Sequence, residues 1–302
     1  MIRLGVDFGG SKIEAAALDA DGRFLSRRRR PNPGAYDAAV AAVCALVAEV
    51  EADVGPVAAV GVGAPGSVSP RTGVVRNANT VWLNGRAFRD DLEGALARPV
   101  KLANDANCLA LSEAVDGAGA GAGSVFAVVL GTGCGGGFVR GGRLVEGANG
   151  LAGEWGHLPL PWPHANERPG PQCWCGRRGC LETWVAGPGL QRDHRDATGR
   201  DQSPGEIVAA ARDGDAEARA AMARHASRLG RGLAMLCDVV DPDVFVFGGG
   251  LSNISELYEA LPDMIRPHVF SEAWQAVLAP ARWGDSSGVR GAAWLWDLGD
   301  GG

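Results

Sequence analysis

Three cysteines within eight residues form the densest group of possible metal ligands in the chain. They are Cys173, Cys175 and Cys180, and His157 precedes them. A structural Zn²⁺ site uses four such sulfur and nitrogen ligands, and glycines between them let a short loop bend toward one point. We predict that His157 and the three cysteines bind a structural Zn²⁺, with His164 as the alternative to His157. Four protein ligands leave no open position for substrate, so a catalytic ion is not expected.

A disulfide is the alternative use of these thiols. The chain shows no export signal, because its first apolar segment is a strand that Asp7 interrupts. Disulfides are rare in the reducing cytoplasm, where we expect this protein to be. The remaining cysteines lie in apolar segments and are expected to pack as small core residues: Cys44, Cys108, Cys134 and Cys237.

Length and charge narrow the possible functions. With 302 residues, 46% of them hydrophobic, the chain is long enough for two domains. A net charge of -6 gives no basic surface for nucleic acid or an anionic membrane. No apolar run approaches the roughly 20 residues of a membrane-spanning helix, which predicts a soluble protein. The basic block at residues 27–30 precedes a Pro-rich turn and is interpreted as an exposed strand end.

Two glycine-rich turns follow apolar strands. The first is Gly9, Gly10, Ser11 and Lys12, just after Asp7, and the second is the segment 131–137, which contains Gly131, Thr132 and Gly133. Bare backbone N–H groups, a hydroxyl and an ammonium can approach phosphate oxygens, while a carboxylate at a strand end can hold Mg²⁺. Neither turn has the spacing of a Walker A loop. The pair predicts ATP binding, with Asp7 as the Mg²⁺ partner.

The pattern of elements is repeated. Strands at 2–8, 13–18 and 23–28 are followed by alternating helices and strands, and a second series begins with a strand at 125–130. The remaining expected helices span 36–51, 89–97, 104–114, 206–212, 216–239 and 288–296, and the remaining strands span 57–62, 100–103 and 244–247. Two mixed α/β lobes with a nucleotide between them are expected. We place the first at 1–117, completed by a helix within 288–302, and the second at 118–287, with the zinc loop at 157–180.

Polar groups near these turns suggest phosphoryl transfer to a hydroxyl. Asn104 and Asp105 stand at a strand-to-helix junction, where a helix N-cap is the ordinary interpretation. Phosphoryl transfer needs a carboxylate that accepts the proton of the attacking hydroxyl, and Asp105 is placed for that role. A zinc clamp would also hold Glu154, His157 and Glu182 near one another, where they could bind sugar hydroxyls.

These motifs together resemble the ROK family of sugar kinases. The segments that carry the resemblance appear in family order: Asp7–Lys12, Asn104–Cys108, Leu130–Gly133, Gly153–His157 and Cys173–Glu182. Ser11 replaces the usual Thr, and the segment 159–171 is a Pro-rich insert. Three further stretches, at 66–70, 76–85 and 285–294, resemble the bacterial fructokinase (mannokinase) branch most closely.

The resemblance implies a two-lobed, actin-like ATPase fold of the ribonuclease H-like class, and a homodimer. It implies that Asp105 is the catalytic base for a hexose 6-hydroxyl, with fructose expected first and mannose second. The implied sugar contacts are Asn79, Asn104, Asp105, Glu154, His157 and Glu182. The implied ATP contacts are Gly9, Gly10, Ser11, Lys12, Gly131, Thr132 and Gly133, with Gly248, Gly249 and Gly250 near the adenosine.

Several alternatives remain. N-acetylglucosamine kinase and glucokinase belong to the same family, and sugar choice depends on pocket shape. A sugar-responsive repressor of the same family carries a DNA-binding segment before the first glycine turn. Because Asp7 is the seventh residue, we expect no such segment here. A sugar-independent ATPase is disfavoured by Glu154, His157 and Glu182.

Overall fold

A computed structural model describes residues 2–296, and it divides the chain into two compact units. The first unit comprises residues 1–127, 137–153 and 282–302, and the second comprises residues 128–136 and 154–281. These bounds differ from the boundary expected at residue 117. The strand at 124–130 begins in the first unit and ends in the second, so the chain passes between the units inside this strand. Residues 297–302, part of the expected terminal helix, lie outside the described residues.

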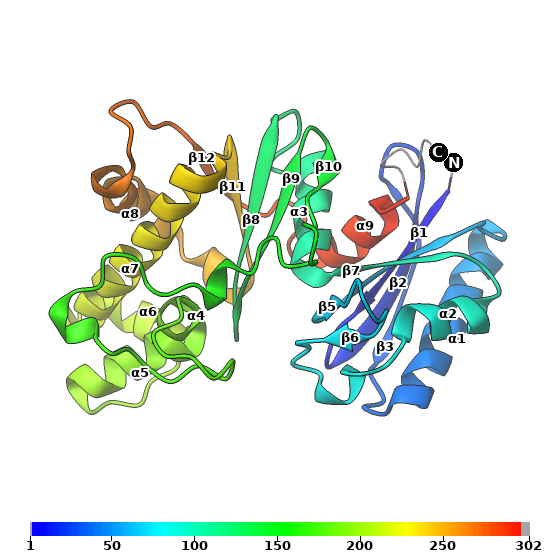
Figure 1. Cartoon of the computed structure of the whole chain (residues 1–302), viewed down its shortest axis with the longest axis horizontal. Coiled ribbons are helices and arrows are strands. Elements are labelled where there is room, and N and C mark those ends of the chain that lie inside the picture. The colour runs from blue at the N-terminus through cyan, green and yellow to red at the C-terminus, as the bar shows by residue number, and fades with distance from the viewer. Residues whose placement is uncertain (1, 297–302) are drawn as a thin grey trace. The chain divides into compact units, whose positions relative to one another are not determined.

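Unit 1 is built on a five-stranded mixed sheet with the order β3-β2-β1-β4-β7 (Figure 1). The strands are β1 (Arg3–Phe8), β2 (Lys12–Leu18), β3 (Phe24–Pro31), β4 (Val60–Ala64) and β7 (Val100–Asn104). β1, β4 and β7 run parallel, and β2 is antiparallel to both of its neighbours. The first glycine turn joins β1 to β2, and all five predicted strands of this lobe are confirmed. The carboxyl ends of the parallel strands therefore share one edge of the sheet.

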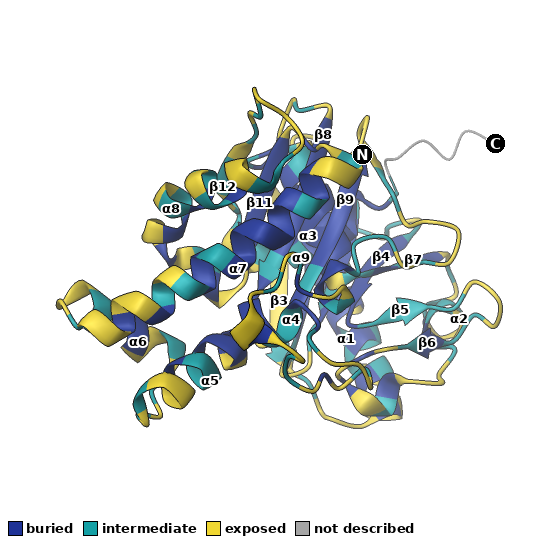
Figure 2. Ribbon diagram, turned by 60° about the vertical axis from the view of Figure 1, so that its left-hand side comes forward, coloured by how far each residue is buried: buried dark blue, intermediate teal, exposed yellow. Residues whose placement is uncertain are grey.

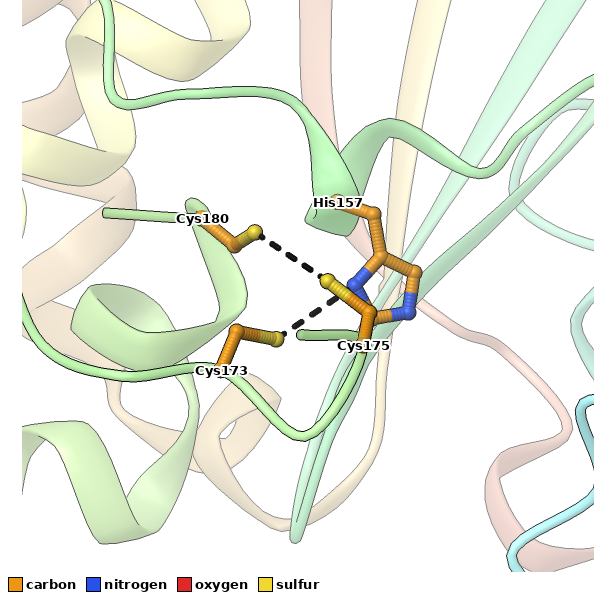
Figure 3. A group of neighbouring side chains, drawn as sticks. All are labelled: His157, Cys173, Cys175 and Cys180. Atoms are coloured by element: carbon orange, nitrogen blue, oxygen red, sulfur yellow. Dashed lines mark hydrogen bonds between the residues drawn. The ribbon is translucent and has the colours of Figure 1, made fainter. Parts of the chain in front are cut away.

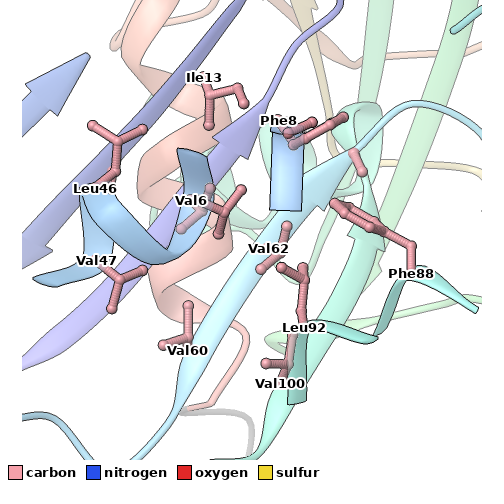
Figure 4. Packing of buried hydrophobic residues seen from close by; sticks show 14 of the residues in the cluster. Val6, Phe8, Ile13, Leu46, Val47, Val60, Val62, Phe88, Leu92 and Val100 are labelled. Carbon is pink, nitrogen blue, oxygen red and sulfur yellow. The ribbon is translucent and has the colours of Figure 1, made fainter. Parts of the chain in front are cut away.

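One face of this sheet is covered by α1 (Tyr36–Val54) and α2 (Phe88–Leu96). Strand alternation turns Leu4, Val6 and Phe8 toward these helices, where they are fully buried. Figure 4 shows the resulting packing, in which side chains of β1, β4, α1 and α2 interdigitate. Phe8 and Phe88 lie 4.8 Å apart between ring centroids. The apolar helix patterns expected at 36–51 and 89–97 are thus explained by burial against the strands.

The opposite face is covered by α9 (Ser287–Trp294), which also packs against α3 (Asp105–Val115). Gly61 of β4 faces α9 so closely that a Cβ there would lie 1.8 Å from the carbonyl oxygen of Ala292. Gly5 of β1 has the same relation to α9, with 2.2 Å to the carbonyl oxygen of Val289. The absence of side chains at these two strand positions lets the helix backbone sit directly on the sheet.

Unit 1 also contains several short elements. They are β5 (Ser67–Val68), β6 (Val75–Arg76), β10 (Arg143–Leu144), η1 (Val81–Leu83) and η6 (Gly284–Ser286).

The basic block lies on the edge strand β3, and its arginines pair with carboxylates. Arg27 and Arg29 both bind the buried Glu14, while Arg28 binds Asp53 at 2.5 Å. These pairs agree with the interpretation of the block as part of a solvated strand.

The second sheet has the order β10-β9-β8-β11-β12. Its longer strands are β8 (Ser124–Leu130), β9 (Cys134–Arg140), β11 (Val244–Gly248) and β12 (Val277–Pro280). Figure 2 shows β8, β9 and β11 as largely buried ribbons. The predicted strands at 125–130 and 244–247 are confirmed. β12 was not predicted, because it is only 4 residues long and its ends are exposed.

Helices make up most of unit 2. They are α4 (Glu182–Val185), α5 (Gly187–Thr198), α6 (Pro204–Arg212), α7 (Ala216–Val240) and α8 (Ser255–Ile265), with the short turns η2 (Trp155–His157), η3 (Ala165–Glu167), η4 (Gly250–Asn253) and η5 (Arg266–His268). α5, α6 and α7 share a small apolar core. The helices at 206–212 and 216–239 were predicted. α5 and α8 were not predicted, because each contains a proline, a residue that usually interrupts a helix. No helix among residues 2–296 combines the length and the apolar character needed to cross a membrane.

Candidate functional site

His157 and the three clustered cysteines converge in unit 2. Figure 3 shows their side chains pointing toward a common centre from η2 and from the loop before α4. The Nδ1 atom of His157 lies 3.7 Å from the sulfur of Cys173, and the sulfurs of Cys175 and Cys180 lie 3.6 Å apart. All four ligand atoms lie within 4.8 Å of one another.

These distances fit a metal ion better than a disulfide. A disulfide requires about 2.05 Å between sulfurs. A tetrahedral Zn²⁺ with bonds of about 2.3 Å to sulfur and about 2.0 Å to nitrogen holds its ligand atoms roughly 3.5 to 3.8 Å apart. His157 supplies the nitrogen in this group. His164 instead caps η3, where its backbone N–H donates to Glu167.

A bound cation would stabilise the thiolate forms of these cysteines. Burial, together with hydrogen bonds to Cys175 and Cys173, raises the pKa of Cys180 to about 12. Burial is likewise the main cause that raises the pKa of Cys173. Adjacent thiolates repel one another, and a positive ion between them would offset this repulsion. The donor set, its spacing and its electrostatics therefore fit Zn²⁺.

Glu182 joins the metal-ligand loop to the second glycine turn. Its Oε1 atom accepts a hydrogen bond of 2.7 Å from the indole N–H of Trp174, and its Oε2 atom accepts one of 2.9 Å from the backbone N–H of Cys134. Glu182 was predicted as a sugar contact, and Trp174 was assigned no role. The position of Trp174 between two ligand cysteines was the signal that could have pointed to it.

The residues between Glu154 and His157 pack against the same glycine-rich segment. Glu154 precedes η2, and a Cβ on the following Gly156 would lie 2.1 Å from the carbonyl oxygen of Cys134. The indole N–H of Trp155 donates to the carbonyl of Gly135 at 2.9 Å. Trp155 and Gly156, which lie between Glu154 and His157, thus pack against Cys134 and Gly135, and Glu182 binds Cys134 as well.

A cavity of about 650 Å³ opens next to this turn within unit 2. Gly131 and Thr132 line it on one side and Gly250 on another, so two of the predicted nucleotide segments meet there. Gly248 ends β11, and Gly249 has a φ of +83° and would clash with the carbonyl of Leu130 if it had a side chain. The remaining lining residues come from α5, α6 and η4 and their borders, and none of them was predicted: Gly187, Pro188, Gln191, Pro204, Gly205, Val208, Arg212, Leu251, Asn253 and Ile254.

The predicted residues of unit 1 gather at the carboxyl edge of its sheet. Asp7 lies near the end of β1, and Asp105 begins α3 directly after β7. Burial, followed by the charges of Asp105 and Glu14, raises the pKa of Asp7 to about 6. Asp7 and Asp105 are therefore close enough to repel each other, which is an arrangement that a divalent cation or a phosphate-bound cation stabilises.

Backbone contacts fix the loops around these carboxylates. Asn104 is the N-cap of α3, where its Oδ1 accepts from Ala106 N at 2.9 Å, and its amide donates to the carbonyl of Gly66 at 2.8 Å. In the first glycine turn, Gly9 N donates to Lys12 O at 2.9 Å, and both Ser11 and Gly10 are exposed. A Cβ on Gly10 would lie 3.5 Å from the hydroxyl of Thr80, whose neighbour Asn79 is exposed.

The chain is similar in sequence and in fold to known proteins over nearly its whole length. The ROK family matches residues 3–298. An N-acetyl-D-glucosamine kinase from Shigella boydii serotype 4 is 37% identical over 296 residues, covering 96% of this chain and 98% of the relative. A ROK hexokinase structure from Thermus thermophilus has a TM-score of 0.86 and 37% identity, with 97% of each chain covered.

A further solved structure extends the comparison. The ROK family glucokinase from Streptomyces griseus, in complex with glucose and AMPPNP, has a TM-score of 0.80 and 33% identity, covering 99% of this chain and 100% of that chain. These similarities span nearly the whole length of each pair. They establish the mixed α/β, two-sheet fold of these sugar kinases for this chain.

Proposed function

Because the chain belongs to the ROK family, we propose that it is a sugar kinase that transfers the γ-phosphoryl group of ATP to the 6-hydroxyl of a hexose, with N-acetyl-D-glucosamine as the first candidate. The observation that supports this sugar is the 37% identity to an N-acetyl-D-glucosamine kinase over 96% of the chain.

Fructose was the sugar predicted first from the sequence. The relatives favour N-acetyl-D-glucosamine, which was the stated alternative, so fructose and mannose now follow it. Glucose stays among the candidates because of the similar Streptomyces griseus glucokinase. A polar pocket separates such sugars mainly through the hydroxyl or acetamido groups that it leaves paired or unpaired.

Asp105 is proposed as the catalytic base. Its carboxylate accepts the proton of the sugar 6-hydroxyl, the resulting oxygen attacks the γ-phosphorus, and the bond from that phosphorus to the bridging oxygen of ADP breaks. Asn104, which fixes the start of α3, and the exposed Asn79 are proposed sugar contacts in unit 1. Glu154, His157 and Glu182 are the proposed contacts in unit 2.

The nucleotide is assigned to both glycine turns. Gly9, Gly10, Ser11 and Lys12 in unit 1, and Gly131, Thr132 and Gly133 in unit 2, are proposed to bind the phosphates through backbone N–H groups and polar side chains. The cavity of about 650 Å³ that Gly250 lines is proposed for the adenosine, since Pro188, Leu251 and Ile254 give it apolar walls.

Two metal ions belong to the proposal. Mg²⁺, held near Asp7, would neutralise the charge that develops on the transferred phosphate. Zn²⁺, held by His157, Cys173, Cys175 and Cys180, would act structurally, because the four ligands fill its coordination sphere. A homodimer, which the family resemblance implies, completes the proposal.

The decisive experiment is an ADP-coupled kinase assay with N-acetyl-D-glucosamine, fructose, mannose and glucose. We expect the highest kcat/KM for N-acetyl-D-glucosamine and a phosphorylated product at position 6 by NMR. A higher kcat/KM for fructose would instead support fructose as the substrate, as first predicted from the sequence. Absence of turnover with all four sugars would refute the hexose kinase proposal.

A further inference from the structure

The carboxylate of Glu182 has one protein partner on each oxygen. The indole N–H of Trp174 reaches Oε1 at 2.7 Å, and the backbone N–H of Cys134 reaches Oε2 at 2.9 Å. Trp174 belongs to the metal-ligand loop, whereas Cys134 belongs to the glycine turn 131–137. Hydrogen bonds to a charged acceptor are the stronger kind, so Glu182 is a firm link between these segments.

Trp174 is held in place despite its exposure. Its side chain is 66% exposed, yet its ring meets the ring of the metal ligand His157 edge-on, with 4.9 Å between centroids and an interplanar angle of 81°. The indole therefore contacts a ligand with its ring and Glu182 with its N–H. An exposed tryptophan with two such fixed contacts is better explained by a positioning role than by core packing.

The glycine turn receives Glu182 at very short range. A Cβ on Gly133 would lie 2.8 Å from Oε2 of Glu182, so the carboxylate rests directly on the turn. Within the turn, Gly131 N donates to Gly133 O at 3.0 Å, and Gly187 N donates to Gly131 O at 2.8 Å. Gly131 and the next residue, Thr132, line the cavity of about 650 Å³. A shift of Glu182 therefore changes the wall of that cavity.

We propose that the Trp174–Glu182 pair positions the 131–137 turn for ATP, so that the metal loop controls nucleotide affinity as well as the sugar site. The proposal rests on the proposed function only in taking this turn as the ATP phosphate site. Glu182 and Trp174 act here as positioning residues: they hold the Cys134 N–H and hence the turn that contacts the phosphates.

The test measures ATP·Mg²⁺ binding by calorimetry in the absence of sugar, on the zinc-loaded protein. Trp174→Phe removes the indole N–H and keeps the ring beside His157, and Glu182→Gln removes the charge. Each variant should bind ATP on the order of tenfold more weakly, the loss of one charge-assisted hydrogen bond. Zinc content, measured by mass spectrometry, should stay at the wild-type value in both variants.

Trp162→Phe is the matched control. Trp162 is also an exposed tryptophan of unit 2, with 49% exposure, but it stacks on His268 and is not bonded to Glu182. Its variant should bind ATP as the wild type does. The double variant of Trp174→Phe and Glu182→Gln should bind ATP no more weakly than whichever single variant has the lower ATP affinity, because the two residues act as one unit.

Two results would overturn the inference. One is an ATP affinity within about twofold of wild type in both single variants with zinc retained, and the other is fully additive losses in the double variant. Failure of the proposed function looks different: ATP binding follows the expected pattern across the variants, yet no sugar is phosphorylated by the wild type.

Discussion

At the scale of single residues, the proposed reaction depends on one carboxylate at the start of a helix. Asp105 follows β7 directly, and its Oδ1 accepts from the backbone N–H of Ala106 at 2.8 Å. The helix N-terminus and this bond help to orient the carboxylate. The residue that would take the proton lies at a strand-to-helix junction, which is why its position could be predicted from the sequence.

Replacing Asp105 by Asn should remove the base and keep the shape of the site. We expect kcat to fall by about 10² to 10⁴-fold, while the dissociation constant of the sugar changes by less than about threefold. Steady-state kinetics and sugar binding by calorimetry measure the two effects. Asp37→Asn, in the exposed first turn of α1, is the control and should leave kcat unchanged. A kcat within about tenfold of wild type, or about 1.4 kcal/mol in the barrier, would exclude Asp105 as the base.

At the scale of elements, unit 1 depends on a helix that lies directly on strand backbone. Gly61 is the position where α9 comes nearest to β4. Gly61→Ala places a methyl group 1.8 Å from a backbone oxygen, so the helix must move and the core loses contacts. We expect the free energy of unfolding to fall by about 1 to 3 kcal/mol or more, measured by urea denaturation.

A second glycine provides the opposite case. Gly94 lies inside α2, and a Cβ there would meet no atom within 4 Å. Gly94→Ala should raise the free energy of unfolding by about 0.5 to 1 kcal/mol through helix propensity alone. Equal effects of the two substitutions would show that α9 does not need the bare backbone of β4.

The insert at 159–171 is anchored by a buried ion network. Glu167 accepts hydrogen bonds of 2.8 Å from Arg228 and 2.8 Å from Arg231, both on α7, and Arg228 also binds Asp193 of α5. Burial alone would raise the pKa of Glu167, but hydrogen bonds from Arg231 and Arg228 outweigh it and lower the pKa to about 2. The insert that precedes the metal ligands is thus tied to two helices of unit 2.

This pKa predicts an acid-dependent loss of stability. Because the folded pKa lies below the ordinary value of 4.5, the unfolded chain takes up a proton first as the pH falls. The contribution of Glu167 is complete above pH 4.5 and is lost as the pH falls toward 2. Glu167→Gln should cost about 3 to 5 kcal/mol at neutral pH and flatten the pH profile of unfolding in this window. Asp263→Asn, in an exposed pair with Arg266, is the control and should change neither the free energy of unfolding nor its pH profile. A pH profile unaltered by Glu167→Gln would refute the role of Glu167 in acid stability.

At the scale of the whole molecule, the metal site should couple stability to activity. Cys175→Ser removes one of the four ligands, so the zinc content and the Tm should both fall. The KM for sugar should rise, because the metal would no longer hold His157 in position. Metal analysis, calorimetry and kinetics follow these changes, and Cys44→Ser in α1 serves as the control. Protein that is verified to be metal-free yet keeps its Tm and KM would exclude a structural role.

Much of this architecture could be predicted from the sequence because the signals are local. Apolar strands followed by glycine turns are recognisable in seven or eight residues, and the four metal ligands lie within one short stretch. α5 and α8 were missed because a proline near the start of one and inside the other outweighs their amphipathic pattern in a local view. The Glu182–Cys134 bond was also missed, since it joins residues far apart in the chain and depends on how the loops pack.

The docking of α9 on Gly5 and Gly61 also sets an order for folding on the ribosome. β1 and β4 emerge early, but the face that they reserve for α9 stays uncovered until residues 287–294 have been made. Unit 2 is synthesised before that point and can close its own core first. We therefore expect the unit whose strands begin the chain to finish folding last. Its bare sheet face would be the surface on the nascent chain that a chaperone has to protect.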